Sequence, residues 1–186
     1  MKYPRHKLLL IAFLMEGGAL LAALVLSRYL NIQLFPLTDS PLQDILIGTA
    51  GALPPFILFL CVLSKKTKHI SFFGSLRKTM LSEVKEIFSC TKLSDLVLIS
   101  LIAGFAEEML FRGVLQAKYG IVPASIVFGL IHCVSPAYVI VTILMGFYIG
   151  AFFFLSGNML VPIQLHFIYD LAALVYLRYF MNPQDT

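Results

Sequence analysis

The stretch Ala106-Glu-Glu-Met-Leu-Phe-Arg112 places three charged side chains within a long apolar part of the sequence. A charged side chain at the centre of a bilayer costs at least about 2.5 kcal/mol, so an ionisable group at that depth is a marker of function. Later apolar segments add His132, His166 and Asp170. Carboxylates and imidazoles that meet inside a membrane are suited to activating water. The sequence therefore predicts a membrane protein with a polar site between its helices.

The composition of the whole chain supports the membrane assignment. The 186 residues are 59% hydrophobic and only 13% charged, with a mean hydropathy of +0.89, whereas a soluble domain is roughly 45–50% apolar and about 25% charged. The net charge of +4 does not indicate nucleic-acid binding, because the basic residues cluster in two places typical of membrane flanks. Three scattered cysteines predict neither a disulfide framework nor a metal-ligand spacing.

Six apolar segments have about the length that a membrane helix needs, which is roughly 20 residues. They lie at residues 8–26, 45–63, 96–115, 121–134, 137–155 and 159–180. We interpret the first as a retained helix rather than a signal peptide, because further spans follow it. In the second, Pro54-Pro55 predicts a kink or break. The expected fold class is an all-α transmembrane helical bundle with about six spans, of which the fourth is short.

Between the second and third spans lies a basic segment, residues 64–93. Its apolar residues recur at helical spacing, at Leu76, Met80, Leu81, Val84 and Ile87. This pattern predicts an amphipathic helix that lies on an anionic leaflet. A solvated loop with one short helix is the alternative.

The chain divides into three regions. Residues 1–95 hold two membrane helices and the basic segment, residues 96–180 form a helical core with the polar motifs, and residues 181–186 are a tail. Within the core, Gly146 and Gly150 form a GxxxG pattern, which predicts close packing of two backbones rather than a catalytic role.

Basic residues indicate the orientation, because the cytoplasmic flanks of membrane helices are rich in Lys and Arg. With six spans, eleven of the 14 Lys and Arg residues lie on the side of both termini. They are Lys2, Arg5, Lys7, Lys65, Lys66, Lys68, Arg77, Lys78, Lys85, Lys92 and Arg178. The other side receives Arg28, Arg112 and Lys118. Both termini are therefore predicted to be cytoplasmic, in an integral membrane protein.

Counting residues along the helices places the polar groups at one depth. Glu107 precedes the loop near residues 116–120 by about nine residues, or roughly 13 Å. His132 follows that loop by about eleven residues, and His166 follows the loop at residues 156–158 by about eight. Because both loops lie on the same side, the three groups share one level, which favours a single site nearer the outer face.

The two adjacent glutamates are expected to differ in role. Neighbouring helical residues point about 100° apart, so Glu108 can pair with Arg112 at i,i+4 while Glu107 is free to face a site. A carboxylate that is partly withdrawn from water holds a proton more tightly, which suits a general base. The alternative is a buried charge cluster that holds the helices together, with Glu16 included.

Two further motifs repeat the i,i+4 spacing. Phe128 shares a face with His132, so this imidazole can orient water beside an aromatic wall. His166 shares a face with Asp170, which can fix its tautomer and stabilise its cation. A hydrogen-bonded core histidine and a helix-packing polar pair are the alternatives. Cys133 points about 100° away from His132, which argues against a cysteine protease.

Two imidazoles with two carboxylates can also bind zinc. A divalent metal at Glu107, His132 and His166, with Asp170 nearby, is therefore an alternative to metal-free chemistry. The HExxH motif is absent, so the sequence does not require a cofactor.

These motifs together resemble the CAAX-protease and bacteriocin-processing family, also called the CPBP or Abi family of intramembrane proteases. The family pattern is EExxxR, then FxxxH, then HxxxN or HxxxD. The matching residues are Glu107-Glu108-Met-Leu-Phe-Arg112, Phe128-Gly-Leu-Ile-His132 and His166-Phe-Ile-Tyr-Asp170. The resemblance covers residues 96–177.

The resemblance implies a glutamate-dependent membrane endopeptidase in which Glu107 activates water and His132 is its partner. It also implies that His166 binds the oxyanion of the tetrahedral intermediate, with position 170 assisting. Asp170 departs from the Asn form of the motif, because an ionised carboxylate cannot donate a hydrogen bond. We expect Asp170 to orient His166 instead. The family is described both as metal-dependent and as metal-free.

The expected reaction is hydrolysis of a peptide bond in a membrane-associated protein or peptide, so the expected partners are the bilayer and this substrate. The small build resembles prokaryotic members, which are linked with peptide maturation and bacteriocin immunity. Prenylated substrates fit a host that makes them. The eukaryotic CAAX members open their site to the cytosol, and a re-entrant segment at Pro54-Pro55 would reconcile that with the depth count. A non-catalytic scaffold or immunity protein and a proton-coupled transporter are the alternatives.

Overall fold

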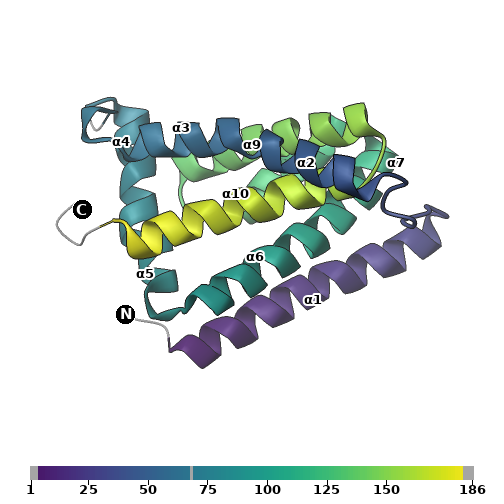
Figure 1. Ribbon diagram of the computed structural model, residues 1–186, viewed down its shortest axis with the longest axis horizontal. Coiled ribbons are helices and arrows are strands. Elements are labelled where there is room, and N and C mark those ends of the chain that lie inside the picture. Colours follow the sequence, from purple (N-terminus) through teal and green to yellow (C-terminus); the bar gives the residue numbers. More distant parts are fainter. Residues whose placement is uncertain (1–3, 68, 182–186) are drawn as a thin grey trace.

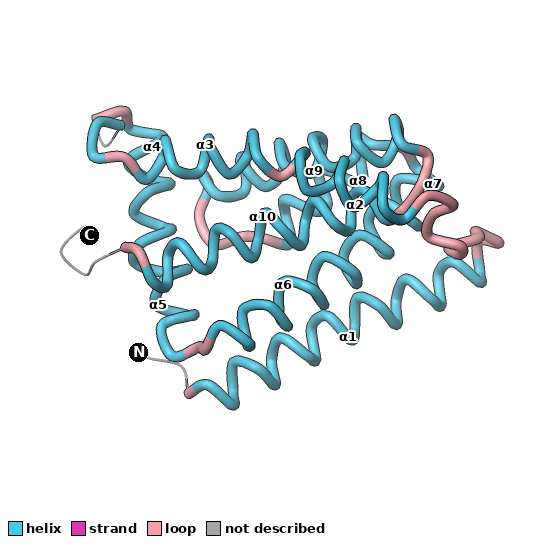
Figure 2. The backbone as a smooth tube through the Cα atoms, in the orientation of Figure 1, coloured by secondary structure: helices cyan, strands magenta, loops and turns pink. Residues whose placement is uncertain are grey.

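The computed structural model describes residues 4–67 and 69–181. Within these residues the chain forms helices and no strand, as Figures 1 and 2 show. The longer helices are α1 (Arg5–Tyr29), α2 (Pro41–Gly51), α3 (Leu53–Leu63), α4 (Ser71–Lys78), α6 (Leu93–Glu108), α8 (Ile121–Ile131), α9 (Pro136–Ser156) and α10 (Leu160–Tyr179). The shorter helical turns are η1 (Lys65–Thr67), η2 (Thr79–Val84), α5 (Lys85–Ile87), η3 (Phe88–Cys90), η4 (Met109–Gln116) and α7 (Ala117–Tyr119). The predicted all-α bundle is confirmed, while Lys2, Lys68 and residues 182–186 of the tail lie outside the described residues.

α10 is the central helix of the bundle. It packs against α6, α2, α9 and α3, and α1 lies along α6 (Figure 1). The first turn of α1 is tied to the first turn of α6 by Arg5, whose Nη2 donates to Asp95 Oδ1 at 2.6 Å. The N-terminal helices therefore support the two helices that carry most of the polar motifs.

The helices alternate in direction along the bundle. α1, α6 and α9 run one way, and α2–α3, α8 and α10 run back (Figure 1). The start of α1 and the end of α10 therefore lie at the same end, together with α4 and α5. We call this the basic end, because Arg77, Lys78 and Lys85 belong to its helices. Its position agrees with the charge asymmetry predicted from the sequence.

In the described chain, four helical segments are long and apolar enough to cross a membrane. They are Arg5–Tyr29, Pro41–Leu63, Pro136–Ser156 and Leu160–Tyr179. A fifth is counted if the bent pair Ser71–Cys90 and Leu93–Tyr119 is taken as one span. The predicted count of about six is higher because α8 has only 11 residues, or about 16 Å against a hydrocarbon core of roughly 30 Å. In addition, Leu93–Tyr119 carries the charges of Glu107, Glu108 and Arg112.

The second span is broken at Ala52, between α2 and α3. Pro54 stands in the first turn of α3, where its missing N–H leaves no helical hydrogen bond unmade. The kink or break predicted from Pro54-Pro55 is therefore confirmed. Because Pro41–Leu63 still counts as one span, the break does not make it a re-entrant segment.

The basic segment lies across the basic end, since its helical run Ser71–Cys90 is bent by 112° from Leu93–Tyr119. The sequence predicted an apolar face that rests on a leaflet, and the structure corrects this. Leu76, Met80 and Leu81 are buried in a cluster with apolar side chains of α3, α9 and α10. The ends of those helices present an apolar surface at the basic end. The apolar face of the segment packs on this protein surface instead of on lipid.

Glycines let α9 approach its neighbours closely, as the GxxxG pattern predicted. A Cβ added to Gly146 would lie 2.9 Å from the Cα of Ser125, and one added to Gly150 would lie 2.5 Å from the Gln116 side chain. Because the helices are so close, side chains of η4 can donate hydrogen bonds to the carbonyl groups of both glycines. Arg112 donates to Gly146 O at 3.1 Å, and Gln116 donates to Gly150 O at 2.8 Å. The pattern therefore also anchors polar side chains of η4.

Replacing Gly146 by Ala is expected to destabilise the protein by about 1–3 kcal/mol, because the new methyl group meets backbone rather than a flexible side chain. The measurement is thermal unfolding of the purified protein in detergent. Gly17→Ala is the matched control, since no atom lies within 4 Å of its added Cβ and Ala favours a helix over Gly by about 0.5–1 kcal/mol. Equal unfolding temperatures for the two variants would contradict close packing at Gly146.

Candidate active site

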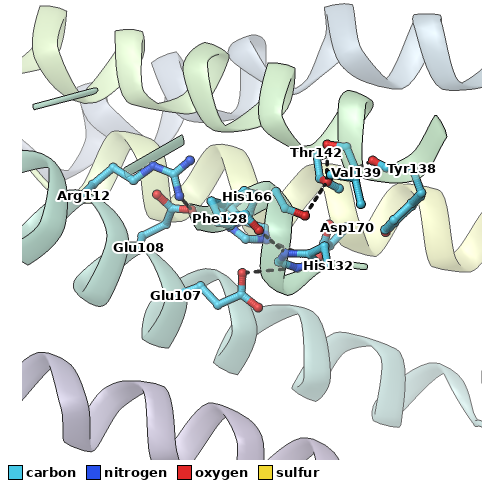
Figure 3. A network of polar contacts seen from close by, with 11 residues as sticks. Glu107, Glu108, Arg112, Phe128, His132, Tyr138, Val139, Thr142, His166 and Asp170 are labelled. Atoms are coloured by element: carbon cyan, nitrogen blue, oxygen red, sulfur yellow. Dashed lines mark hydrogen bonds and ion pairs between the residues drawn. The ribbon is translucent and has the colours of Figure 1, made fainter. Parts of the chain in front are cut away.

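Glu108, Arg112 and His166 form a buried charged group at the centre of the bundle (Figure 3). Arg112 Nη1 donates to Glu108 Oε1 at 2.9 Å, as the i,i+4 spacing predicted. His166 Nδ1 donates to the same oxygen at 2.6 Å. The three residues are 0%, 1% and 5% exposed, so water does not screen their charges. A buried carboxylate with two such donors is compensated, whereas the loss of one donor is costly.

The helix that carries these charges changes its winding directly after Glu108. Residues Met109–Gln116 form a π-helical stretch, η4. Such stretches are rare and occur frequently at functional sites. Arg112 lies within it and spans two helices, since it bonds both Glu108 of α6 and the Gly146 carbonyl of α9. A reading of the sequence at 3.6 residues per turn does not predict this stretch.

Glu107 points away from the buried group and faces His132 (Figure 3). Glu107 Oε2 lies 3.7 Å from His132 Nε2 and has no hydrogen-bond partner in the described part of the chain. Because α8 ends at Ile131, the Phe128 carbonyl lacks a helical partner, and His132 Nδ1 bonds it at 2.8 Å. With its proton on Nδ1, neutral His132 presents a lone pair on Nε2 toward Glu107.

A cavity that His132 lines has room for water. A distance of 3.7 Å is too long for a direct hydrogen bond, but one water can bond both atoms. A cavity of about 80 Å³ is lined by His132, His166 and Asp170, and by Phe128 and Tyr138 among others. Since one water occupies about 30 Å³ in the liquid, the cavity has room for a water molecule.

Asp170 lies on the opposite side of His166 from Glu108. Its Oδ2 is 3.4 Å from His166 Nε2, so both ring nitrogens of His166 face carboxylates. The Asp170 side chain is 32% exposed and lines the cavity. The two carboxylates hold the imidazole in one orientation, which agrees with the orienting role expected for Asp170.

The ring of Phe128 forms an aromatic wall of the site. It lies 4.7 Å from the His132 ring and 6.1 Å from the His166 ring, centroid to centroid. The Arg112 guanidinium stands 4.6 Å from its centroid, and the edge of Phe111 packs against it at 5.0 Å. The ring thus contacts both imidazoles and the buried cation, as expected of a residue one turn before His132.

The cavity reaches toward the basic end of the bundle. Met80 of the basic segment lines it, and the neighbouring Thr79 donates through Oγ1 to Ser135 Oγ at 2.8 Å. Ser135 belongs to the connection between α8 and α9. Because α8 is short, this connection spans the remaining distance to the basic end. Counting residues placed the site nearer the opposite face. The structure revises this, since the cavity extends to the end that carries the basic segment.

An apolar groove of about 280 Å³ adjoins the cavity. It lies between α3, α4, α9 and α10, and Met80, Val141, Met145 and Tyr169 line both spaces. The outer part of the groove includes Leu58, whose side chain is 56% exposed. An apolar molecule in this groove would therefore lie beside the two imidazoles.

The sequence of the site matches a known family. The family model described as Type II CAAX prenyl endopeptidase Rce1-like matches residues 89–172. We call residues 89–172 the Rce1-like segment, because they are similar to this model. It contains all the residues of the site predicted from the sequence, from Glu107 to Asp170. The resemblance to the CAAX-protease and bacteriocin-processing family is therefore confirmed.

The chain is also similar to the uncharacterized protein YpbD of Bacillus subtilis (strain 168), with 35% identity over 99 residues. The match covers 51% of this chain and 52% of YpbD, so the chain spans about half the length of the curated relative that it matches. No solved structure matches the chain. The long apolar helices indicate an integral membrane protein, and residues 89–172 are similar to the Rce1-like family model.

Among residues 4–67 and 69–181, no three His, Cys, Asp or Glu side chains are grouped so that they could hold a metal ion. At His166 both ring nitrogens face carboxylates, Glu108 and Asp170, so an ion could reach neither nitrogen without moving one of these side chains. A zinc ion at Glu107, His132 and His166 therefore does not fit this arrangement.

The structure adds contacts and residues that the sequence did not indicate. The bond between Glu108 and His166 was not predicted, because it joins two motifs that are 58 positions apart. Tyr138 lines the cavity, and no local pattern marks a tyrosine near a helix start. Glu16 of α1 is half-buried. Its sequence signal was a lone carboxylate in an apolar span, which placed it in the alternative charge cluster.

Proposed function

We propose that this chain is an intramembrane endopeptidase that hydrolyses a peptide bond of a membrane-associated protein or peptide, with Glu107 as the general base. One observation carries the proposal. Glu107 Oε2 and His132 Nε2 are two proton acceptors 3.7 Å apart, and His132 lines a cavity with room for water. Glu108 is committed to Arg112 and His166, whereas Glu107 Oε2 has no hydrogen bond in the described residues and is free to take a proton.

In the proposed reaction, a water molecule donates one hydrogen to Glu107 Oε2 and the other to His132 Nε2. Glu107 removes its proton as the water oxygen forms a bond to the carbonyl carbon, and the carbonyl π electrons move to oxygen as an oxyanion. The carbonyl then re-forms and the C–N bond breaks. The leaving nitrogen takes the proton from the Glu107 carboxyl group, which restores the base.

The buried charged group has a positioning role in this proposal. His166 and Arg112 each donate a hydrogen bond to Glu108, which fixes both side chains. Arg112 also donates to the Gly146 carbonyl. These bonds hold α6, α9 and α10 together around the cavity. Groups that are fixed in advance lose little free energy to reorganisation when charge develops in the transition state.

The apolar groove supports a substrate with an apolar part. The matching family model describes prenyl endopeptidases, and the groove adjoins the cavity through Met80, Val141, Met145 and Tyr169. We therefore propose that a lipidated or otherwise apolar segment lies in the groove and presents its peptide bond to Glu107. The basic end is the cytoplasmic end by the positive-inside rule, so the substrate would enter from the cytoplasm of a prokaryotic cell.

The test compares peptides released from membranes that contain the wild-type protein, Glu107→Gln or no copy of the chain. Mass spectrometry should find peptides that require the wild-type protein and are absent with Glu107→Gln. Glu83→Gln is the matched control, because it makes the same chemical change at an exposed position in the basic segment. All variants are compared at equal accumulation in the membrane.

The same comparison separates an enzyme from a scaffold. If wild-type and Glu107→Gln membranes release identical peptides, the proposed function is wrong. If a cellular phenotype of the protein also survives Glu107→Gln, His132→Ala and His166→Ala, the bundle acts by binding a partner. A phenotype that all three substitutions remove, with release of specific peptides, supports the endopeptidase.

A further inference from the structure

The oxyanion of the proposed reaction needs a hydrogen-bond donor, and the cavity offers few. His166 already directs Nδ1 to Glu108 and faces Asp170 with Nε2. Asp170 accepts hydrogen bonds but, when ionised, cannot donate one. Its negative charge would also repel an oxyanion at short range. A neutral donor from another residue is therefore required beside these two.

Tyr138 meets this requirement by its position. It lines the same cavity as His132, His166 and Asp170, and Figure 3 shows it next to Asp170. Tyr138 shares the cavity with His132, whose Nε2 lies 3.7 Å from Oε2 of Glu107, the carboxylate that would activate water. The residue stands in the first turn of α9, where its backbone N–H bonds Ser135 Oγ at 3.3 Å.

The Tyr138 hydroxyl is also free to donate. The side chain is half-buried, and among the residues that the structure describes no hydrogen-bond partner is found for its hydroxyl, although a tyrosine withdrawn from water usually has one. Tyr148 shows the usual arrangement, since its hydroxyl donates to the Gly51 carbonyl at 2.8 Å. Tyr169 also lines the cavity, but it lines the apolar groove as well, whereas Tyr138 lines the cavity and not the groove. Tyr138 is therefore the tyrosine that belongs to the polar cavity rather than to the apolar groove.

We propose that the Tyr138 hydroxyl donates a hydrogen bond to the oxyanion and is a catalytic residue of this protein. This inference rests on the proposed function. The phenol keeps its proton throughout, so it adds no proton-transfer step to the reaction. The Tyr138 hydroxyl supplies the neutral hydrogen-bond donor that the ionised Asp170 carboxylate cannot supply. An amide at position 170 could donate through its NH₂ group, so in such a variant the need for Tyr138 would fall.

The test measures kcat and KM in proteoliposomes, on a fluorogenic peptide copied from a cleavage site found in the membrane comparison. Tyr138→Phe should lower kcat by about 10²–10³-fold, the usual effect of removing one oxyanion donor, with KM nearly unchanged. Tyr176→Phe is the matched control and should behave as wild type, because this α10 tyrosine packs against Phe56 and Phe59 outside the cavity.

A second arm tests the link to position 170. Asp170→Asn combined with Tyr138→Phe should recover at least tenfold of the kcat lost in Tyr138→Phe alone. A merely structural role for Tyr138 predicts no such recovery. If Tyr138→Phe fails to accumulate, 3,5-difluorotyrosine at position 138 keeps the ring and hydroxyl, and kcat should then change with the acidity of the phenol.

The outcomes distinguish this inference from the proposed function. If Tyr138→Phe keeps kcat within threefold of wild type while Glu107→Gln is inactive, Tyr138 is not the donor and the endopeptidase stands. An increase in KM alone also overturns the inference, because it assigns Tyr138 to substrate binding. If no peptide is cleaved by the wild-type protein, the proposed function fails and the inference fails with it.

Discussion

Glu107→Gln is expected to lower kcat by about 10²–10⁴-fold while the protein stays folded. The size of the loss follows from removing a general base, because an amide oxygen does not take a proton at neutral pH. The fold should tolerate the change, since Glu107 Oε2 makes no hydrogen bond in the described residues and Gln has the same shape. The measurement is turnover of the fluorogenic peptide in proteoliposomes, together with the unfolding temperature in detergent.

The neighbouring glutamate provides the sharpest comparison for this result. Glu108 accepts from Arg112 and His166 and is fully buried, so Glu108→Gln should lower the unfolding temperature far more than Glu107→Gln does. One glutamate thus serves chemistry and the next serves stability. Turnover above one tenth of the wild-type rate in Glu107→Gln would exclude this residue as the base.

Arg112→Met is expected to cost about 3–5 kcal/mol of stability, enough to reduce strongly the amount of folded protein in the membrane. Removal of one partner leaves Glu108 as an incompletely paired buried charge. The Gly146 carbonyl loses its donor at 3.1 Å, and Phe128 loses the cation at 4.6 Å. The measurement is accumulation in the membrane and unfolding temperature after extraction.

A double variant separates the charge effect from simple loss of packing. Glu108→Gln combined with Arg112→Met removes both charges, so it should be more stable than Arg112→Met alone. Buried ion pairs often behave in this way, because apolar or neutral groups of similar volume avoid the cost of burying charge. A single Arg112→Met variant that unfolds at the wild-type temperature would contradict the proposed role of Arg112.

Much of the fold follows from local properties of the sequence. The apolar segments at residues 121–134, 137–155 and 159–180 agree with α8, α9 and α10 within a few residues, because the length and hydropathy of a membrane helix depend mainly on its own residues. The pairing of Glu108 with Arg112 also followed from spacing, since i,i+4 side chains on a helix are neighbours. The rise per residue of an α-helix was enough to predict that Glu107 and His132 lie at the same depth in the membrane.

Other features depend on contacts between distant segments. The burial of Leu76, Met80 and Leu81 could not be predicted, because their apolar face suits a leaflet as well as it suits the ends of α3 and α10. The early end of α8 is a second case. Its apolar residues continue to Val134 in the sequence, yet the helix stops at Ile131 and His132 bonds a carbonyl of its last turn.

The amino-acid order alone established a helical membrane bundle and the types of polar side chain that it holds, since hydrophobic length and residue chemistry are local. Three-dimensional packing assigned the partners. From residue chemistry alone, either glutamate of the Glu107-Glu108 pair could contact either imidazole. The packing of α10 on α6 brings His166 to Glu108, and the end of α8 places His132 beside Glu107. The physical reason is that a buried charge is stable only where donors from other helices converge on it.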